Sequence, residues 1–307
     1  MLFRVKRWSK KKVEHKSAFI AIVGRPNVGK STILNRIVGA KVAIISKKPQ
    51  TTRNKIVGVL TGQDYQMVFL DTPGVHSPRN RLGEFMVKTA YDSARDVEAI
   101  LFMCDAQRGI EQEDLDILQK LLRGGSAIVA AVNKTDSAGK QKSLDAAQAL
   151  KDAGFEGETH LISAKTGEGV DELLAVLKMF LIPGPRYYPD DEYTDQPERV
   201  IAAEMIREKA LRLLMEEVPH GIGVSVDSVK HREDKDIVDV TATIICERNT
   251  HKGMIIGHGG KMLKRIGTEA RIDLEMLFGS KVYLELWVKV EEGWRDSTRV
   301  MRELGYE

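Results

Sequence analysis

Short apolar runs alternate with longer amphipathic stretches over residues 18–181, and this alternation constrains the fold more than any other feature of the chain. Five runs are nearly continuous, as in strands buried on both faces of a mainly parallel sheet: AFIAIV, MVFL, AILFMC, AIVAAV and THLIS. Residues 54–61 add another expected strand. Between the runs the spacing is helical, and Val170, Leu173 and Leu177 share one helix face. The pattern predicts a three-layer α/β domain with a mostly parallel sheet.

The pattern changes after residue 182. Residues 183–198 contain four prolines and five acidic residues with little apolar periodicity, which is typical of a linker at a domain boundary. Beyond it the expected element order is αββααβ, which indicates a small α+β domain. The expected elements are an amphipathic helix over 199–217, alternating strands over 222–229, 237–245 and 282–290, two short helical pieces meeting at 257–260, and a last helix near 294–303.

Composition is that of an ordinary soluble protein, with 42% apolar and 30% charged residues. Forty-seven basic residues nearly balance forty-four acidic ones, so an anionic partner has to be inferred from local clusters rather than from the net charge of +3. Cys104 and Cys246 lie in apolar runs and are expected to be buried thiols in a reducing compartment. No apolar run reaches the roughly 20 residues of a membrane span. We therefore expect a cytoplasmic protein.

The first 16 residues form a basic extension without the apolar stretch of a secretory signal. Two interpretations stay open. The extension is either a disordered solubilising tail or an electrostatic arm that touches RNA or an anionic membrane surface. The second interpretation predicts a weak peripheral contact with the inner face of the cell membrane.

The segment GRPNVGKS fits the pattern G-x-x-x-x-G-K-[ST] and lies between an expected strand and an expected helix. Glycines let the backbone wrap around phosphates, and the helix that begins near Gly29 adds its positive end. Lys30 would place a cation on the β- and γ-phosphates, and the Ser31 hydroxyl can ligate Mg²⁺. An accidental glycine turn is the alternative, which the strand–loop–helix context disfavours. The expected nucleotide contacts here are Gly24, Arg25, Pro26, Asn27, Val28, Gly29, Lys30, Ser31 and Thr32.

A second motif, Asp71-Thr72-Pro73-Gly74, directly follows the run MVFL. An aspartate at the carboxyl end of a strand stands where such sheets bind ligands. Asp71 would hold Mg²⁺ through water, and the Gly74 N–H would donate to the γ-phosphate. The next residue is Val75, at a position where Ras-type proteins place a water-orienting glutamine. A valine cannot orient water, so slow intrinsic hydrolysis is expected.

A third motif, Asn133-Lys134-Thr135-Asp136, follows the run AIVAAV. Guanine presents N1–H and the 2-amino group as adjacent donors, and the Asp136 carboxylate can accept both. Adenine lacks this donor pair, so the motif selects GTP over ATP. Asn133 would tie neighbouring loops together and approach N7, while the aliphatic stem of Lys134 would cover one face of the base.

Ser163-Ala164-Lys165 ends the next run, and there the Ala164 N–H would face guanine O6. In this order, GRPNVGKS, DTPG, NKTD and SAK resemble the P-loop GTPase motifs of the Ras-like translation-factor superclass. Together with PQTTR at residues 49–53, DTPGVHSPRNRLG and a later glycine motif, they make the chain resemble the Era family of bacterial GTPases from about residue 18 to its end. The resemblance implies a P-loop NTPase domain that binds GTP, GDP and Mg²⁺, and a role in 30S ribosomal subunit biogenesis through the 3′ region of 16S rRNA. We expect a monomer.

Residues 40–53 form the expected first switch, in which a threonine ligates Mg²⁺ only when the γ-phosphate is present. Thr51 and Thr52 are both available, and Thr52 is favoured. Loss of the γ-phosphate would release this segment. The resemblance also implies an activating K⁺ held partly by Asn27, unless Asn27 only shapes its loop. The candidate catalytic residues are Lys30, Thr52, Gly74 and Asn27, and the candidate metal ligands are Ser31, Thr52 and Asp71.

The glycine motif IIGHGGK has the I-G-x-x-G form of a KH domain, and the element order matches the type II arrangement. Such glycines let a loop approach a nucleic-acid backbone while an adjacent apolar groove accepts about four bases. Basic residues cluster nearby, with Glu269 as the main opposing charge, which suits RNA phosphates. A glycine turn in a structural helix pair is the alternative. The expected RNA-binding residues are Ile256, Gly257, His258, Gly259, Gly260, Lys261, Lys264 and Arg265.

The sequence therefore predicts a GTPase switch that binds small-subunit rRNA. One alternative is a non-catalytic RNA-binding protein with GTP as a structural ligand, which Val75 makes conceivable. Another is a tRNA-modification GTPase, in which a KH segment is unexpected. The expected domains are a basic extension over 1–16, an Era-type G domain over 17–182, a linker over 183–198 and a type II KH domain over 199–307.

Overall fold

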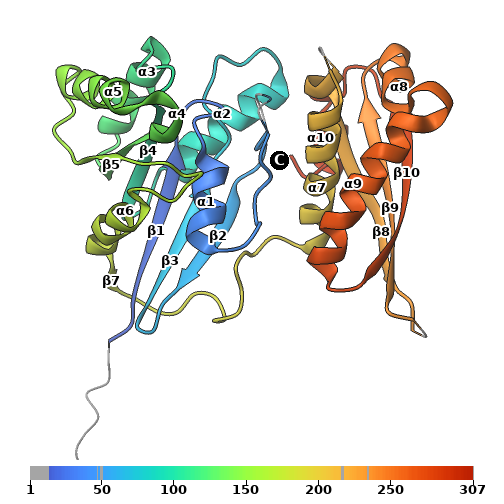
Figure 1. Cartoon of the computed structure of the whole chain (residues 1–307), viewed down its shortest axis with the longest axis horizontal. Helices are drawn as coiled ribbons and strands as arrows, with labels where there is room; N and C mark the ends of the chain where they lie inside the picture. Colours follow the sequence, from blue (N-terminus) through green and yellow to red (C-terminus); the bar gives the residue numbers. More distant parts are fainter. Residues whose placement is uncertain (1–13, 47, 49–50, 216–217, 234, 307) are drawn as a thin grey trace, which may run out of the picture.

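The computed structural model of the chain describes residues 14–46, 48, 51–215, 218–233 and 235–306. Two units, each a sheet with helices packed on it, stand next to each other (Figure 1). Most of the expected basic extension over 1–16 lies outside the described residues, and Lys16 already begins the first strand.

The first unit is built on a sheet of order β2-β3-β1-β4-β5-β6, with β7 paired to β1. The pairings are parallel except those of β2 with β3 and of β7 with β1. Every residue of β4 is buried, which accounts for its uninterrupted apolar run. The strands are β1 (Lys16–Val23), β2 (Ile56–Thr61), β3 (Tyr65–Asp71), β4 (Ala99–Asp105), β5 (Ala127–Asn133), β6 (Thr159–Leu161) and β7 (Ile182–Pro183).

Helices cover both faces of this sheet. On one face α1 (Lys30–Val38) and α6 (Val170–Leu177) pack through residues such as Leu34 and Leu173. The other face carries α2 (Arg81–Ser93), α3 (Gln112–Leu122) and α5 (Lys140–Asp152), packed through residues such as Ala90, Leu118 and Leu150. The three-layer α/β prediction is confirmed. The carboxyl ends of β1, β3, β5 and β6, where the predicted motifs begin, meet at one edge of the sheet.

The segment expected as a linker lies against the first sheet. The Gln66 side chain bonds the backbone of Tyr187 and Tyr188, and the Val59 N–H donates to the Tyr193 carbonyl at 2.9 Å. The segment that connects the units is therefore hydrogen-bonded to β2 and β3 before the second unit begins.

The second unit is a three-stranded sheet of order β10-β9-β8, in which β9 is antiparallel to β8 and parallel to β10. This confirms the type II αββααβ arrangement. Its elements are α7 (Glu198–Leu213), β8 (Gly223–His231), β9 (Ile237–Cys246), α8 (Asn249–Ile256), α9 (Lys261–Phe278), β10 (Lys281–Val290) and α10 (Thr298–Glu303). At 18 residues, α9 is not the short piece that was expected, because buried apolar residues continue at helical spacing through Ile266, Ala270 and Leu274.

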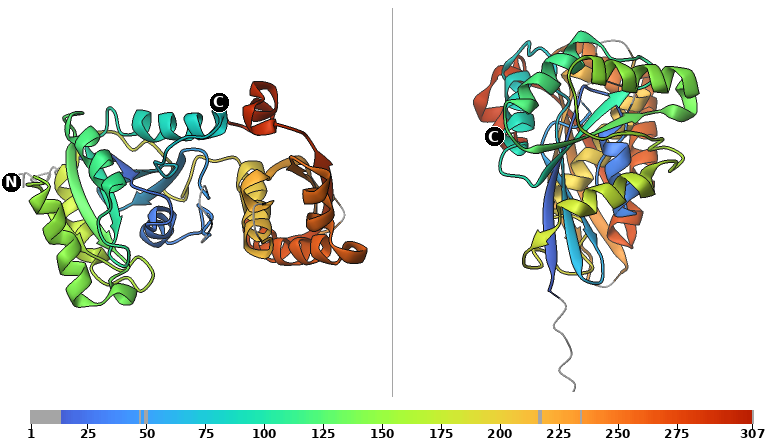
Figure 2. Two further views of the ribbon diagram at one scale, coloured as in Figure 1. Left: turned by 90° about the horizontal axis from the view of Figure 1, so that it is seen from above. Right: turned by 90° about the vertical axis from the view of Figure 1, so that its left-hand side faces the viewer.

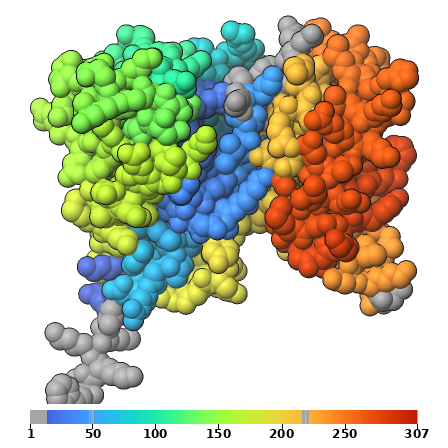
Figure 3. Space-filling model, viewed as in Figure 1, coloured from blue at the N-terminus to red at the C-terminus, as the bar shows by residue number. Residues whose placement is uncertain are grey.

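Helix α7 also departs from the prediction. It ends at Leu213, and residues 216–217 of the expected helix lie outside the described residues. The sequence indicates one buried side, on which Ile206 and Ala210 are indeed buried. The structure also buries polar residues of this helix, among them Arg207 and Lys209. The reason is that α7 packs on its own sheet and also faces the first unit (Figures 1 and 3).

A second contact joins the units near the C-terminal end of the chain. There α2 lies beside the C-terminal segment of the chain (Figure 2). Leu82 and Met86 of α2 share an apolar cluster with Trp294, Met301 and Tyr306. Across this contact the Arg81 N–H donates to the Asp296 carboxylate at 3.0 Å. In the described part of the chain, no helix has the length and apolar character needed to span a bilayer.

Candidate nucleotide site and nucleic-acid groove

The loop between β1 and α1 is a backbone cradle whose glycines cannot be replaced. Gly29 has φ 107°, and a Cβ there would lie 2.1 Å from the Asn133 Nδ2. A Cβ on Gly24 would lie 2.3 Å from the Met103 carbonyl oxygen. No side chain of the described residues caps the start of α1 at Lys30. The first N–H groups of that helix are therefore available to an anion in the cradle.

The Lys30 side chain folds back onto the backbone of this loop. Its Nζ donates to the carbonyls of Gly24 at 3.0 Å and Arg25 at 2.9 Å. Burial lowers the pKa of Lys30 to about 8, while the nearby Asp71 acts to raise it. A polyanion held in the cradle would favour the charged form of this lysine.

Arg25, expected among the nucleotide contacts, has a side chain that is engaged elsewhere. The guanidinium is buried and turns onto α3, with ion pairs of 2.7 Å to Asp114 and 2.5 Å to Glu111. Only the backbone of Arg25 lines the cradle, and its side chain anchors the loop from behind. The sequence holds no local signal for this, because the partners lie almost ninety residues away.

Three oxygen-bearing side chains meet beside the cradle. The Ser31 hydroxyl lies 2.8 Å from that of Thr52 and 2.6 Å from Asp71 Oδ2, and Thr52 lies 3.4 Å from the same oxygen. Burial raises the pKa of Asp71 to about 6, and its Oδ1 has no hydrogen-bond partner among the described residues. Mg²⁺ prefers such oxygen ligands, so these residues fit the ion. Thr51 does not join them, since its hydroxyl donates to the Lys48 carbonyl.

The DTPG turn touches the cradle from the other side. A Cβ on Gly74 would lie 2.7 Å from both Cα and N of Pro26, and the Val75 N–H donates to the Gly24 carbonyl at 3.2 Å. The Val75 side chain is buried in the apolar cluster that contains Ala90. It therefore faces the core, where it can neither contact nor orient a water near the phosphates.

Asn133 and Asp136 stand at the carboxyl end of β5. The Asn133 amide ties two loops together, donating to the Val28 carbonyl at 2.7 Å and accepting from the Ala164 N–H at 2.8 Å. The Asp136 carboxylate is exposed and accepts from the Ser163 hydroxyl at 2.8 Å. That hydrogen bond holds the pKa of Asp136 below its ordinary value, so the carboxylate stays an acceptor. The Ala164 N–H was expected to face guanine O6, but in this structure its partner is Asn133.

Two residues that the sequence analysis missed support the base site. Asp105, at the end of β4, pairs with Lys134 at 2.5 Å and holds its stem in place. Arg36 of α1 donates to the Ala164 carbonyl at 2.6 Å. The aspartate ending an apolar run could have been noticed, whereas Arg36 resembles any helix surface residue. The remaining predicted residues lie in the same loops and helix starts. They are Thr32, Thr72, Pro73, Thr135 and Lys165.

The second unit carries a groove of about 410 Å³ between α9 and β10. Gly257, Gly259 and Gly260 of the turn before α9 have φ of 71°, 58° and 77°, values that favour glycine. Gly260 and Lys264 line the groove. Ile256 ends α8, His258 lies in the turn and Lys261 begins α9. Arg265 instead pairs with Glu269 at 3.3 Å. The lining residues are Gly260, Leu263, Lys264, Gly267, Thr268, Arg271, Val282, Tyr283, Leu284 and Leu286.

In the sequence, Tyr283 and Trp287 of the last strand are candidates to stack on bases or to pack under the first helix, and Tyr283 does line the groove. The apolar residues of β10 that line it were not predicted, because only the tertiary fold brings that strand beside α9. Its apolar Leu284 and Leu286 make one side of the groove, and Lys264 and Arg271 provide positive charge on the other. This combination suits unstacked bases whose phosphates follow the basic edge.

Comparisons with known proteins agree with this geometry. A protein-family model described as a 50S ribosome-binding GTPase matches residues 19–134, and one described as a KH domain matches residues 217–295. The GTPase Era of Alkaliphilus metalliredigens is 47% identical over 96% of this chain and 100% of its own length. The GTPase Era of Clostridioides difficile is 49% identical over 95% of this chain and 98% of its own.

Two solved structures are similar over almost the whole chain. One is Era in complex with MgGDPNP and nucleotides 1506–1542 of 16S ribosomal RNA, with a TM-score of 0.91, 39% identity, and coverage of 95% of this chain and 99% of that one. The other is a variant of Aquifex aeolicus Era bound to GDP and AlF4⁻, with a TM-score of 0.90, 40% identity and the same coverage.

Proposed function

This chain belongs to the Era family of GTPases, and from that premise we propose that it hydrolyses GTP slowly and binds the 3′ region of 16S rRNA during 30S subunit biogenesis. The observation that carries the proposal is a single sheet edge at which a phosphate cradle, an oxygen-lined ion site and an exposed carboxylate meet. A groove suited to single-stranded nucleic acid lies in the same chain.

Each part of the nucleotide site has a distinct task. Asp136 accepts the two donors of guanine, and Lys30 with the cradle N–H groups holds the β- and γ-phosphates. The residues that would hold Mg²⁺ are Ser31, Thr52 and Asp71, and the ion supplies neutralisation of the phosphate charge. The Gly74 N–H would donate to the γ-phosphate, so the first switch segment and the region after Gly74 respond to the presence of that phosphate.

The rRNA partner is supported by the related structure that holds nucleotides 1506–1542 of 16S rRNA. Similarity over 96% of the chain, the KH segment included, favours this function over that of a tRNA-modification GTPase. The non-catalytic alternative predicts no turnover. Single-turnover hydrolysis of GTP by the purified chain, with and without an RNA of the 16S 3′ region, is the test. We expect measurable hydrolysis, and its absence under both conditions would overturn the GTPase assignment.

Potassium dependence provides a second test, since Asn27 adopts φ 65° at the edge of the cradle. We expect hydrolysis to be faster in K⁺ than in Na⁺ by about tenfold, because a held cation stabilises charge that develops on the phosphates. Asn27→Gly tolerates the left-handed backbone and removes the side chain. If Asn27 holds the ion, this variant loses the K⁺ stimulation and keeps its GDP affinity. If the residue only shapes the loop, the stimulation persists.

We also propose that the protein acts as a monomer in the cytoplasm. For the basic extension over residues 1–16, deleting residues 2–13 and measuring binding to the RNA and to anionic vesicles distinguishes the two interpretations. An electrostatic arm predicts that binding to one of these surfaces weakens, and a solubilising tail predicts that neither changes.

A further inference from the structure

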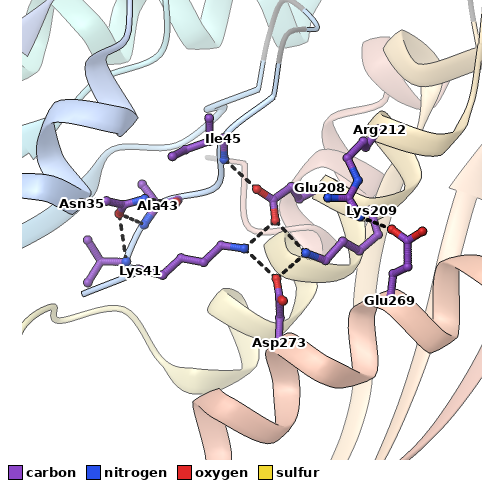
Figure 4. A network of polar contacts seen from close by, with 10 residues as sticks. Asn35, Lys41, Ala43, Ile45, Glu208, Lys209, Arg212, Glu269 and Asp273 are labelled. Carbon is purple, nitrogen blue, oxygen red and sulfur yellow. Dashed lines mark hydrogen bonds and ion pairs between the residues drawn. The ribbon is translucent and has the colours of Figure 1, made fainter. Parts of the chain in front are cut away.

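The second unit holds the first switch segment, residues 40–53, close to both of its ends. At the start of the segment, Lys41 Nζ lies 2.6 Å from Glu208 Oε2 of α7 and 2.6 Å from Asp273 Oδ2 of α9 (Figure 4). The Ile45 N–H donates to Glu208 Oε1 at 3.0 Å. One carboxylate of the second unit thus binds the segment at two points.

The residues between these contacts are divided between the two units. Ile44 is 2% exposed and belongs to the apolar core cluster of the second unit. Val42 and Ala43 instead donate their N–H groups to the Asn35 amide oxygen of α1, at 3.0 and 2.9 Å (Figure 4). The start of the segment therefore bridges the G domain and the KH domain.

At the far end of the segment, Arg207 of α7 is buried and donates to the Thr51 carbonyl. Glu204, one turn earlier on α7, fixes this guanidinium by accepting from Arg207 Nε at 2.8 Å. A buried arginine oriented by a carboxylate is a rigid donor, because its planar group has little freedom left to lose.

Arg53 lies two residues after Thr51 and enters the second unit. It is 1% exposed, and its Nη1 donates to the Ile222 carbonyl at 2.7 Å. Its guanidinium stands 5.5 Å from the ring centroid of Trp294 and 5.8 Å from that of Tyr306, within the range of cation–π contacts.

Thr52 lies between these two anchored residues, with its hydroxyl at the ion site beside Ser31. We propose that Arg207 of the KH domain and Arg53, whose side chain that domain holds, are positioning residues of the GTPase site, which place Thr52 for Mg²⁺ and the γ-phosphate. This inference rests on the proposed role of Thr52. Because Thr52 is placed in advance, less backbone freedom is lost when GTP binds. By linkage, GTP in turn strengthens the contact between the domains.

The test compares Arg207→Met with Arg212→Met. Arg212 is an exposed residue of the same helix, paired with Glu269 inside the second unit. We expect Arg207→Met to weaken binding of a non-hydrolysable GTP analogue about tenfold at saturating Mg²⁺, with GDP affinity kept within about twofold, since GDP has no γ-phosphate to engage Thr52. Amide hydrogen exchange over residues 51–54 should lose its protection by the analogue. Arg212→Met should match the unmodified protein in both measurements.

Equal losses of GTP-analogue and GDP affinity, or unchanged affinity with retained protection, would overturn the inference. If Arg207→Met fails to fold, Glu204→Gln loosens the same arginine and should shift the ratio of analogue to GDP affinity in the same direction. Thr52→Ala distinguishes a failure of the proposed ligand role of Thr52 from a failure of the positioning role of Arg207. If it leaves that ratio unchanged, the proposed ligand role of Thr52 fails and the positioning role with it. If it lowers the ratio while Arg207→Met and Glu204→Gln do not, the positioning role alone fails.

Discussion

Replacing Asp136 by asparagine should lower the affinity for GTP and GDP by about 10²- to 10⁴-fold while RNA binding stays unchanged. Guanine places two donors against this carboxylate, and hydrogen bonds to a charged group contribute about 1.5–3 kcal/mol each. The substituted amide can turn only one acceptor toward them and sets its own donor against a donor. Titration calorimetry with both nucleotides in Mg²⁺ measures the loss.

Xanthosine triphosphate provides the control for this variant. Xanthine carries an oxygen where guanine has its 2-amino group, so the asparagine NH₂ of Asp136→Asn meets an acceptor. The variant should therefore bind xanthosine triphosphate better than it binds GTP, which a misfolded site would not do. Unchanged GTP affinity would mean that another group reads the base.

The parts of the site that the sequence predicted are those whose chemistry is local. The glycines at 24, 29 and 74 lie where a backbone atom or, at Gly29, the Asn133 amide nitrogen comes closer than any Cβ allows. Each motif also follows an apolar run, and parallel strands carry their carboxyl ends to one edge. Motif order and strand order together therefore predicted that the candidate phosphate, ion and base motifs would meet at one edge of the sheet, without knowledge of tertiary contacts.

The contacts between the domains could not be predicted, because their residues look ordinary in the sequence. Lys41 and Glu208 are 167 residues apart, and each is typical of a solvated surface. Arg207 lies in a helix whose periodicity indicates one buried side, yet α7 is enclosed by its own sheet and by the first unit. Arg25 was assigned to the nucleotide by its place in the motif, while the carboxylates that hold it come from α3.

A large loss of RNA affinity is expected from substitutions in the turn before α9. Gly259→Asp should weaken binding of a 16S 3′-region RNA about 100-fold while GTP affinity is kept. Gly259 has φ 58°, which aspartate tolerates better than most residues, and no described atom lies within 4 Å of an added Cβ. The fold should therefore persist, while the new carboxylate repels the phosphate that the loop is built to approach. Fluorescence anisotropy at one fixed salt concentration measures the change.

Gly279→Asp is the matched control, since Gly279 has φ 64°, also lacks a described atom within 4 Å of an added Cβ, and lies at the opposite end of α9. It adds the same charge and similar strain to the same domain, so a comparable loss of RNA affinity would contradict the assignment of the loop.

Gly257→Asp should lose RNA binding and also destabilise the second unit, because its Cβ would lie 2.7 Å from the Met262 Cβ. In Gly259→Asp and Gly279→Asp GTP binding is expected to persist, since an added Cβ at either glycine meets no described atom within 4 Å and the second unit stays folded. A parallel loss of GTP affinity in Gly259→Asp would instead mean that this turn communicates with the nucleotide site.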